Sequence, residues 1–318
     1  MKIEEYLKNN IPSLEGKTYV VTGANSGLGF SLTKQLSMKN AHVIMACRNE
    51  QKATKAIESI KKEQEDANLT FMRYDQADKA SIHEFVQNLK SIGEIDAIVL
   101  NAGIFHPKKG LKTKDGYPLT IGTNFLGVYF LVQELEELVK ERKIKRIVFI
   151  SSFVRHFGKT RHPEKYFLRE RCSLIHQYSV SKWMMYAYAL LLMNRFYGQC
   201  EVTIAHPGLA STNIVLEEHS SLPKWVQKAG KKFLQIFANS SDKSALSFAV
   251  ATTKSPANLG YFCPRGLFHM KGFPKEKRLH LRAKKYQRLE KALLNLWSIK
   301  WVDFIGYLVD VFFICMNH

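Results

Sequence analysis

One stretch near the N-terminus decides the fold of this 318-residue chain: Val20-Val21-Thr22-Gly23-Ala24-Asn25-Ser26-Gly27-Leu28-Gly29. An apolar, strand-like run ends at Thr22, and three glycines follow at the spacing G-x-x-x-G-x-G before a helical pattern begins. Glycines allow a tight turn and a close approach of the backbone to a ligand, and the N-terminus of a helix attracts anions such as a pyrophosphate. The stretch therefore predicts the strand, turn and helix that open a dinucleotide-binding βαβ unit.

The rest of the chain continues this alternation of strands and helices. Short apolar runs predict strands at Thr18–Thr22, His42–Ala46, Leu69–Tyr74, Ala97–Asn101, Arg146–Ser151, Glu201–Ala205 and Leu259–Cys263. Helical spacing lies between them, at Leu28–Lys39, Glu50–Glu63, Ser81–Ser91 and Asn124–Arg142. The order predicts an α/β fold: a Rossmann-type, doubly wound parallel sheet of about seven strands, with helices on both faces, in a single domain. Ligands of such sheets bind at the carboxyl ends of the strands.

Domain boundaries follow from the same pattern. Residues 1–13 form an N-terminal extension, 14–298 the α/β domain, and 299–318 an amphipathic C-terminal tail. Two segments interrupt the rhythm after strand ends, Phe153–Gln177 and about Ser211–Ser241. Such segments are where a substrate pocket and its lid are built, so 211–241 is expected to be the lid.

Composition narrows the setting and the partners. The five cysteines form no C-x-x-C pair, and residues 1–13 lack the apolar core of a secretory signal, so we expect a reduced, cytoplasmic protein. The eleven histidines show no ligand spacing, so no metal is expected. The net charge of +19 is concentrated between Lys271 and Lys291, without a recognisable nucleic-acid motif.

The end of the second predicted strand bears on the choice of cofactor. An NAD-preferring site places an acidic side chain here for the ribose 2′-hydroxyl, but this chain has Ala46-Cys47-Arg48. The forked guanidinium of Arg48 suits a 2′-phosphate. We therefore favour NADP(H) over NAD(H).

A second stretch, Tyr178-Ser179-Val180-Ser181-Lys182, predicts proton chemistry. Residues four apart on a helix lie one turn from each other on the same face. A tyrosine with a pKa of about 10 is a poor acid or base at neutral pH, and bringing it to about 7 takes roughly 4 kcal/mol. A cation about 4 Å away at an effective dielectric near 20 supplies about that much, so Lys182 could activate Tyr178.

Taken together, these motifs resemble the short-chain dehydrogenase/reductase family. The match rests on Thr22–Gly29, Leu100-Asn101-Ala102-Gly103, Asn124, Ser152, Tyr178-x-x-x-Lys182 and His206-Pro207-Gly208, in the order of the family and over roughly 14–298. Ala46-Cys47-Arg48 and the 26-residue step from Ser152 to Tyr178 resemble the retinol dehydrogenase-like and protochlorophyllide reductase-like branch.

The resemblance implies roles for individual residues. Tyr178 would be the general acid/base, Lys182 would also hold the nicotinamide ribose, Ser152 would hydrogen-bond the substrate oxygen, and Asn124 would hold a relay water. The remaining residues would contact the cofactor: Gly23, Asn25, Ser26, Gly27, Leu28 and Gly29 at the phosphates; Arg48 and Asp75 at the adenosine; Asn101, Ala102 and Gly103 as its floor; and Pro207, Gly208 and Thr212 at the nicotinamide.

The expected activity is carbonyl–alcohol interconversion on a small lipophilic substrate, such as a retinoid, a steroid or a fatty aldehyde. Apolar and aromatic residues in the lid segment, from Leu222 to Phe237, suit such a substrate, although they could equally pack on the protein itself. Three alternatives stay open: an inactive NADP(H)-binding scaffold, a reductase of a C=C bond, and a nucleic-acid or membrane binder using the positive charge.

The tail leaves its own alternatives open. Lys300, Asp303, Tyr307 and Asp310 fall on one face of a helical projection, which argues against a membrane span. With the basic stretch before it, 271–318 could lie on an anionic membrane at its cytosolic face, or dock on the protein or on a second copy in a homo-oligomer.

Overall fold

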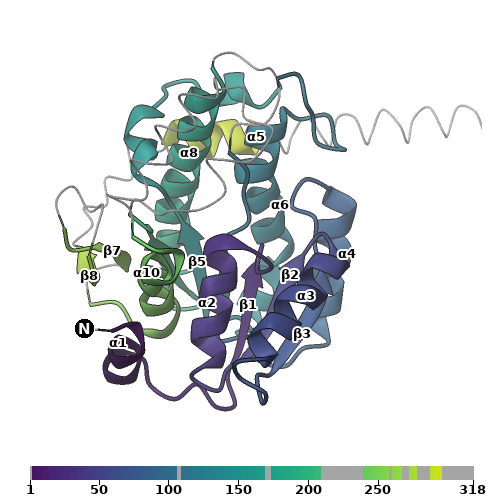
Figure 1. The fold of residues 1–318 in the computed structure, drawn as a ribbon. Coiled ribbons are helices and arrows are strands. Elements are labelled where there is room, and N and C mark those ends of the chain that lie inside the picture. The colour runs from purple at the N-terminus through teal and green to yellow at the C-terminus, as the bar shows by residue number, and fades with distance from the viewer. Residues whose placement is uncertain are drawn as a thin grey trace, which may run out of the picture.

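The computed structural model describes residues 2–105, 109–168, 173–208, 239–257, 260–266, 272–277 and 287–295 (Figure 1). The predicted contacts of Thr212 and the lid segment up to Phe237 lie outside these residues, as does the tail 299–318. Within the described part of the chain, no helix combines the length and the apolar character needed to cross a membrane.

A single twisted sheet runs through the molecule in the order β3-β2-β1-β4-β5-β6-β7-β8. Its strands are β1 (Thr18–Thr22), β2 (His42–Cys47), β3 (Leu69–Arg73), β4 (Ala97–Leu100), β5 (Arg146–Ile150), β6 (Glu201–Ala205), β7 (Tyr261–Pro264) and β8 (Pro274–Lys277). Strands β1 to β7 are parallel, with pairs such as Val20↔Ile44 and Ile98↔Ile147. The order changes direction beside β1, which is the crevice where doubly wound sheets bind dinucleotides.

The predicted doubly wound fold is confirmed, but the sheet has eight strands among the described residues, one more than predicted. The eighth strand, β8, pairs antiparallel with β7 at the edge of the sheet. Its sequence, Pro274-Lys275-Glu276-Lys277, carries a proline and three charges in four residues, so it lacks the apolar pattern that revealed the others. Glu276 strengthens the edge because its carboxylate accepts hydrogen bonds from the Ala257 and Gly260 amides at 3.0 and 3.1 Å.

Helices and helical turns connect the strands and cover both faces of the sheet. They are α1 (Ile3–Asn10), α2 (Gly27–Ser37), α3 (Glu50–Lys61), α4 (Lys79–Lys90), α5 (Leu119–Ile121), the π-helical turn η1 (Gly122–Leu126), α6 (Gly127–Glu134), α7 (Glu136–Lys140), the 3-10 turns η2 (Phe153–Phe157) and η3 (Pro163–Tyr166), α8 (Leu174–Arg195) and α10 (Ser241–Thr253). A further helical stretch covers 287–295.

The core forms two layers because side chains alternate along each strand. Val20, Ile98 and Phe149 point to one face and pack with α4, α6 and α8. Their strand neighbours Val21 and Val99 point to the other face and pack with α1, α2 and α10. The sheet is therefore covered on both sides, which leaves the loops at its carboxyl ends to form a site.

The N-terminal segment 1–13 contributes to this core. Tyr6 and Leu7 of α1 are buried, and the Tyr6 ring stacks on Phe273 with the ring centres 5.0 Å apart. Since Phe273 directly precedes β8, this contact connects the first helix to the antiparallel edge of the sheet.

Candidate active site

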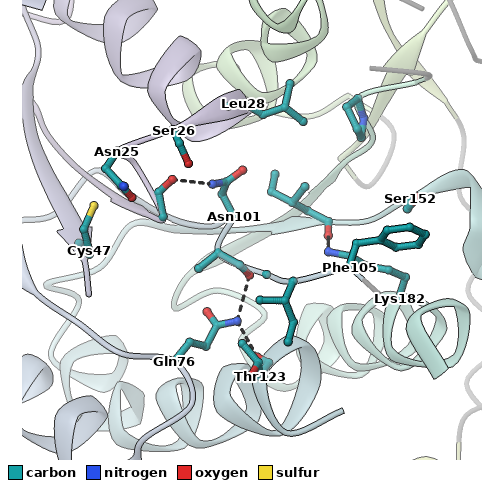
Figure 2. Close-up of a pocket in the computed structure, with 18 of the residues that line it drawn as sticks. Asn25, Ser26, Leu28, Cys47, Gln76, Asn101, Phe105, Thr123, Ser152 and Lys182 are labelled. Atoms are coloured by element: carbon teal, nitrogen blue, oxygen red, sulfur yellow. Dashed lines mark hydrogen bonds between the residues drawn. The ribbon is translucent and has the colours of Figure 1, made fainter. Parts of the chain in front are cut away.

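A cavity of about 460 Å³ opens at the carboxyl ends of the parallel strands. Most of the residues that the sequence assigns to a cofactor or to catalysis line this cavity. They are Gly23, Asn25, Ser26, Gly27, Leu28, Arg48, Asp75, Asn101, Ala102, Gly103, Ser152, Tyr178, Lys182, Pro207 and Gly208. Segments far apart in the sequence therefore meet at one place, as Figure 2 shows.

The glycine turn between β1 and α2 has the backbone shape that a bound pyrophosphate requires. Gly23 and Gly27 have positive φ angles of 65° and 56°, a region that other residues rarely adopt. Gly29 packs so closely that a Cβ atom there would lie 2.4 Å from the Gly23 carbonyl oxygen. The turn thus fits a dinucleotide: its backbone faces the cavity, and α2 begins at Gly27 with its N-terminal amides toward it.

Thr22 joins the two strands beneath this turn. Its buried hydroxyl donates to the Val99 carbonyl at 3.1 Å and accepts from the Asn101 and Ala102 amides, both at 2.9 Å. The Asn101 side chain donates back to the Thr22 carbonyl at 2.8 Å. The floor residues Asn101 and Ala102 are therefore fixed to the glycine turn by hydrogen bonds in both directions.

Arg48 and Asp75 lie together in the cavity lining, just after the ends of β2 and β3. The Arg48 side chain is 76% exposed, and its Nη1 atom is 4.0 Å from an Asp75 carboxylate oxygen. An exposed pair at this distance contributes little to stability. The guanidinium can therefore turn to a phosphate without a large loss to the fold.

Tyr178 and Lys182 lie one turn apart on α8 and both reach the cavity. Lys182 Nζ is 5.8 Å from the centre of the Tyr178 ring and donates to the Ile150 carbonyl of β5 at 3.2 Å. The Tyr178 ring also makes an edge contact with Phe105, with the ring centres 4.6 Å apart and the rings at 88°. A buried ammonium and an aromatic side chain thus both lie near the phenol.

Burial dominates the protonation of this pair. It raises the pKa of Tyr178 to about 12, against the smaller effect of a hydrogen bond with Ser152, which lowers it. Burial also lowers the pKa of Lys182 to about 8. Desolvation thus opposes the charged form of each group, the phenolate of Tyr178 and the ammonium of Lys182.

Asn124 reaches the site through its contacts rather than by lining the cavity. It lies in the π-helical turn η1, and its amide exchanges two hydrogen bonds with the Ile104 backbone, both 2.8 Å long. The same amide nitrogen donates to Ser181 Oγ, beside Lys182, at 3.3 Å. Asn124 therefore connects the loop after β4 to the helix that carries the tyrosine and the lysine.

The loop after β6 is also ordered by a local hydrogen bond. His206 Nδ1 accepts from the Gly208 amide at 2.6 Å, and Gly208 has a φ angle of +77°. Pro207 and Gly208 line the cavity, whereas Thr212, which the sequence places in the same loop, lies outside the described residues.

Gln76, in the cavity lining, and Arg155, beside it, are among the residues that the sequence did not single out. Gln76 lines the cavity, and its amide is buried. The guanidinium carbon of Arg155 lies 4.4 Å from the centre of the Tyr186 ring, and its Nη1 atom donates to the Ser152 carbonyl at 3.4 Å. No local pattern marks Gln76, because its partners Ala102 and Thr123 lie 26 and 47 residues away. The two aromatic partners of Arg155, Tyr186 on α8 and Tyr261 on β7, lie far from it in the sequence, so no local pattern reports these contacts.

The described residues include no set of side chains suited to bind a metal ion. Among the described residues, no three histidine, cysteine, aspartate or glutamate side chains gather closely enough to hold an ion.

The burial of Lys182 leads to a prediction about stability. Its pKa is lowered from 10.5 to about 8 on folding, so the unfolded chain binds more protons between these pH values. Burial of the charged lysine therefore lowers the free energy of unfolding of the wild type. The loss is full below about pH 8 and disappears above about pH 10.5. We expect Lys182→Met to raise the free energy of unfolding at pH 7 by on the order of 2 kcal/mol, after allowance for the lost hydrogen bond.

Urea unfolding of both proteins between pH 7 and pH 10.5 measures this difference, which should shrink as the pH rises. Lys55→Met on the exposed face of α3 is the control and should change little at any pH. A Lys182→Met protein that is less stable than the wild type at pH 7 would contradict the assignment.

Comparison with known proteins agrees with this geometry. A family model described as short chain dehydrogenase matches residues 17–223. A short-chain dehydrogenase/reductase of Phomopsis amygdali is 33% identical over 224 residues, which cover 66% of this chain and 67% of that protein. Retinol dehydrogenase 14 of Mus musculus is 31% identical over 226 residues, which cover 66% of this chain and 65% of that enzyme. The chain thus spans about two thirds of the length of these relatives.

A solved structure extends the likeness beyond the aligned sequences. An uncharacterized protein from Mycobacterium Paratuberculosis superimposes with a TM-score of 0.67 at 25% identity, covering 91% of this chain and 94% of that one. The glycine turn, the cavity and the matched family model lead to the same conclusion. The chain belongs to the short-chain dehydrogenase/reductase family of oxidoreductases and is similar to its retinol dehydrogenase-like branch.

Proposed function

We propose that this protein is an NADP(H)-dependent oxidoreductase that interconverts a carbonyl and an alcohol on a small lipophilic substrate, with Tyr178 as the general acid/base. The observation that carries the proposal is the convergence of Tyr178, Lys182 and Ser152 on the cavity that the glycine turn also lines. The candidate proton donor and the glycine turn thus line the same cavity.

The residues of the site divide the work of such a reaction. The bound nicotinamide would supply or accept the hydride. Tyr178 would give a proton to the substrate oxygen in reduction and take it back in oxidation. Ser152, which shares a hydrogen bond with Tyr178, would donate to the same oxygen as charge develops there. Lys182 would stabilise the deprotonated phenol, and the positive charge of an oxidised nicotinamide would add to its effect.

Preference for NADP(H) is supported at the adenosine end. Arg48 is an exposed guanidinium on the rim of the cavity, and its Nη1 atom lies 4.0 Å from the Asp75 carboxylate, a distance too long for a strong ion pair. A fork of this kind matches the geometry of a phosphate. Asp75 is less suited to grip a ribose hydroxyl, because one of its oxygens accepts from the Ala77 amide at 3.0 Å.

A lipophilic substrate is supported by the wall beside Tyr178. Ile104, Phe105 and Val154 line the cavity there, and Phe105 contacts the tyrosine ring. Apolar walls with few polar groups favour hydrophobic ligands. The similarity to an enzyme named for retinol agrees with this substrate class.

The first prediction from this proposal concerns Tyr178→Phe. Removal of the hydroxyl should lower kcat for NADPH-dependent reduction of lipophilic aldehydes by about 10²- to 10⁴-fold. Binding of NADPH, followed by its fluorescence, should stay close to the wild-type value because the ring and Lys182 remain.

Tyr197→Phe is the matched control, since Tyr197 is 87% exposed and should leave the rate unchanged. If the wild type binds NADPH but reduces or oxidises no member of a broad aldehyde, ketone and alcohol panel, an inactive scaffold becomes the better account. Turnover with enones alone would favour a reductase of C=C bonds.

The second prediction concerns cofactor choice. Arg48→Asp should reverse the ratio of kcat/KM for NADPH over NADH, because the new carboxylate repels a 2′-phosphate and accepts from a ribose hydroxyl. Arg142→Asp makes the same charge change in the loop before β5, at the opposite end of the sheet, and should leave the ratio unchanged. An undiminished preference for NADPH in Arg48→Asp would remove Arg48 from this role.

We also propose peripheral attachment to an anionic membrane through 271–318, on the basis of its basic and amphipathic sequence. Deletion of 299–318 should then reduce co-sedimentation with phosphatidylserine vesicles at low salt. Unchanged sedimentation after the deletion would leave docking on the protein, or on a second copy in a homo-oligomer, as the role of the tail.

A further inference from the structure

Gln76 occupies a position where three parts of the site meet. It follows β3 directly after Asp75, is only 4% exposed, and lines the cavity. Its amide nitrogen donates to the Ala102 carbonyl at 3.0 Å and to the Thr123 carbonyl at 2.7 Å. Figure 2 shows both bonds leaving the same nitrogen, one toward the cofactor floor and one toward the helix.

The other end of the amide is also occupied. Tyr74, two residues earlier, donates its hydroxyl to Gln76 Oε1 at 3.1 Å. Both protons of the nitrogen and one acceptor site of the oxygen are therefore used, which fixes the orientation of the amide. A buried network with these bonds complete is rigid, whereas a partly complete one is costly.

The Thr123 carbonyl has a special place in the helix. In a regular α-helix it would accept from the Gly127 amide, but that amide donates instead to Gly122, five residues back. Gln76 supplies a donor to the carbonyl from outside the helix. The Thr123 carbonyl, which lacks its usual α-helical donor, thus accepts a hydrogen bond from the Gln76 side chain.

Gly127 shows how closely the two segments approach. A Cβ atom at this position would lie 2.0 Å from the Gln76 carbonyl oxygen, so no larger residue fits without a backbone shift. Gln76 therefore contacts the π-helical turn through its side-chain amide and the first residue of α6 through its backbone carbonyl.

The same turn presents Asn124, whose amide holds the Ile104 backbone and contacts Ser181 beside Lys182. From these contacts we infer that Gln76 is a positioning residue that couples the cofactor floor at Ala102 to the turn carrying Asn124, and through it to the Tyr178 helix. The inference rests on the proposed function for its catalytic consequence, while the coupling itself is a property of the fold.

Gln76→Met tests the coupling because it keeps the length and volume of the side chain but removes both donors. We expect kcat to fall by on the order of 10- to 100-fold, since small misplacements of reacting groups cost rates of this size. The KM for the aldehyde should change much less than kcat. Hydrogen–deuterium exchange should become faster in the peptide that spans 119–134, and the affinity for NADPH should decrease.

Gln76→Glu separates hydrogen bonding from space filling. It has nearly the same shape, but at pH 8 an ionised carboxylate would face two carbonyl oxygens and repel them. The expected order of kcat is wild type, then Met, then Glu. A side chain that merely fills space would give Met the wild-type rate.

Gln35→Leu is the matched control. Gln35 is 3% exposed and its amide donates to the Asp242 carbonyl at 2.6 Å, but it lies on α2 outside the cavity lining. It should lower the melting temperature without a change in kcat, in KM or in exchange over 119–134. If Gln76→Met fails to fold, Tyr74→Phe is the milder variant and should lower kcat by about two- to tenfold, the worth of one hydrogen bond.

The readouts keep the two proposals apart. A wild type without turnover would overturn the proposed function, while exchange and NADPH affinity would still decide the role of Gln76. Wild-type exchange over 119–134 and a kcat within about twofold of wild type in Gln76→Met, below the loss expected for one hydrogen bond, would overturn the coupling and leave the function standing.

Discussion

The Thr22 hydroxyl is the point on which the site depends. It closes three hydrogen bonds between the end of β1 and the end of β4, and the Asn101 side chain closes a fourth. All four groups are at the carboxyl edge of the sheet, where a backbone without partners would be exposed to the cavity. An unsatisfied buried amide costs about 1–3 kcal/mol, so loss of this hydroxyl would loosen the floor and the glycine turn together.

From this junction the site is built outward in two directions. The glycine turn and the start of α2 extend to one side of the cavity. Ala102, Gln76 and the π-helical turn extend toward α8, which carries Tyr178 and Lys182. The buried ammonium of Lys182 is then placed against the Ile150 carbonyl, at a cost in stability that burial imposes on the charge. This cost accords with the proposed role of Lys182, because groups with a perturbed pKa in a cavity are candidates for functional residues.

The sequence predicted the parts of this arrangement that are local. Strands such as Thr18–Thr22 and Glu201–Ala205 have the bounds expected from their apolar runs, because a strand buried on both faces is continuously apolar. Tyr178 and Lys182 share a helix face because their spacing requires it. By contrast, the π-helical turn at Gly122–Leu126 and the Gln76 bonds depend on atoms 26 to 47 residues apart, which no local pattern reports. The strand β8 was missed because it is held by pairing and by Glu276, not by its own propensity.

That short strand also shapes how copies of the protein can meet. A parallel sheet that ended at β7 would present the amide and carbonyl groups of an apolar strand to any neighbouring chain. The protein ends its sheet with Pro274, which has no amide proton, and with Lys275 and Lys277 on alternate positions of β8. A second copy adding its own β8 there would bring like charges side by side, and such edges resist continuous sheets between molecules. Aggregation through this edge is thereby discouraged.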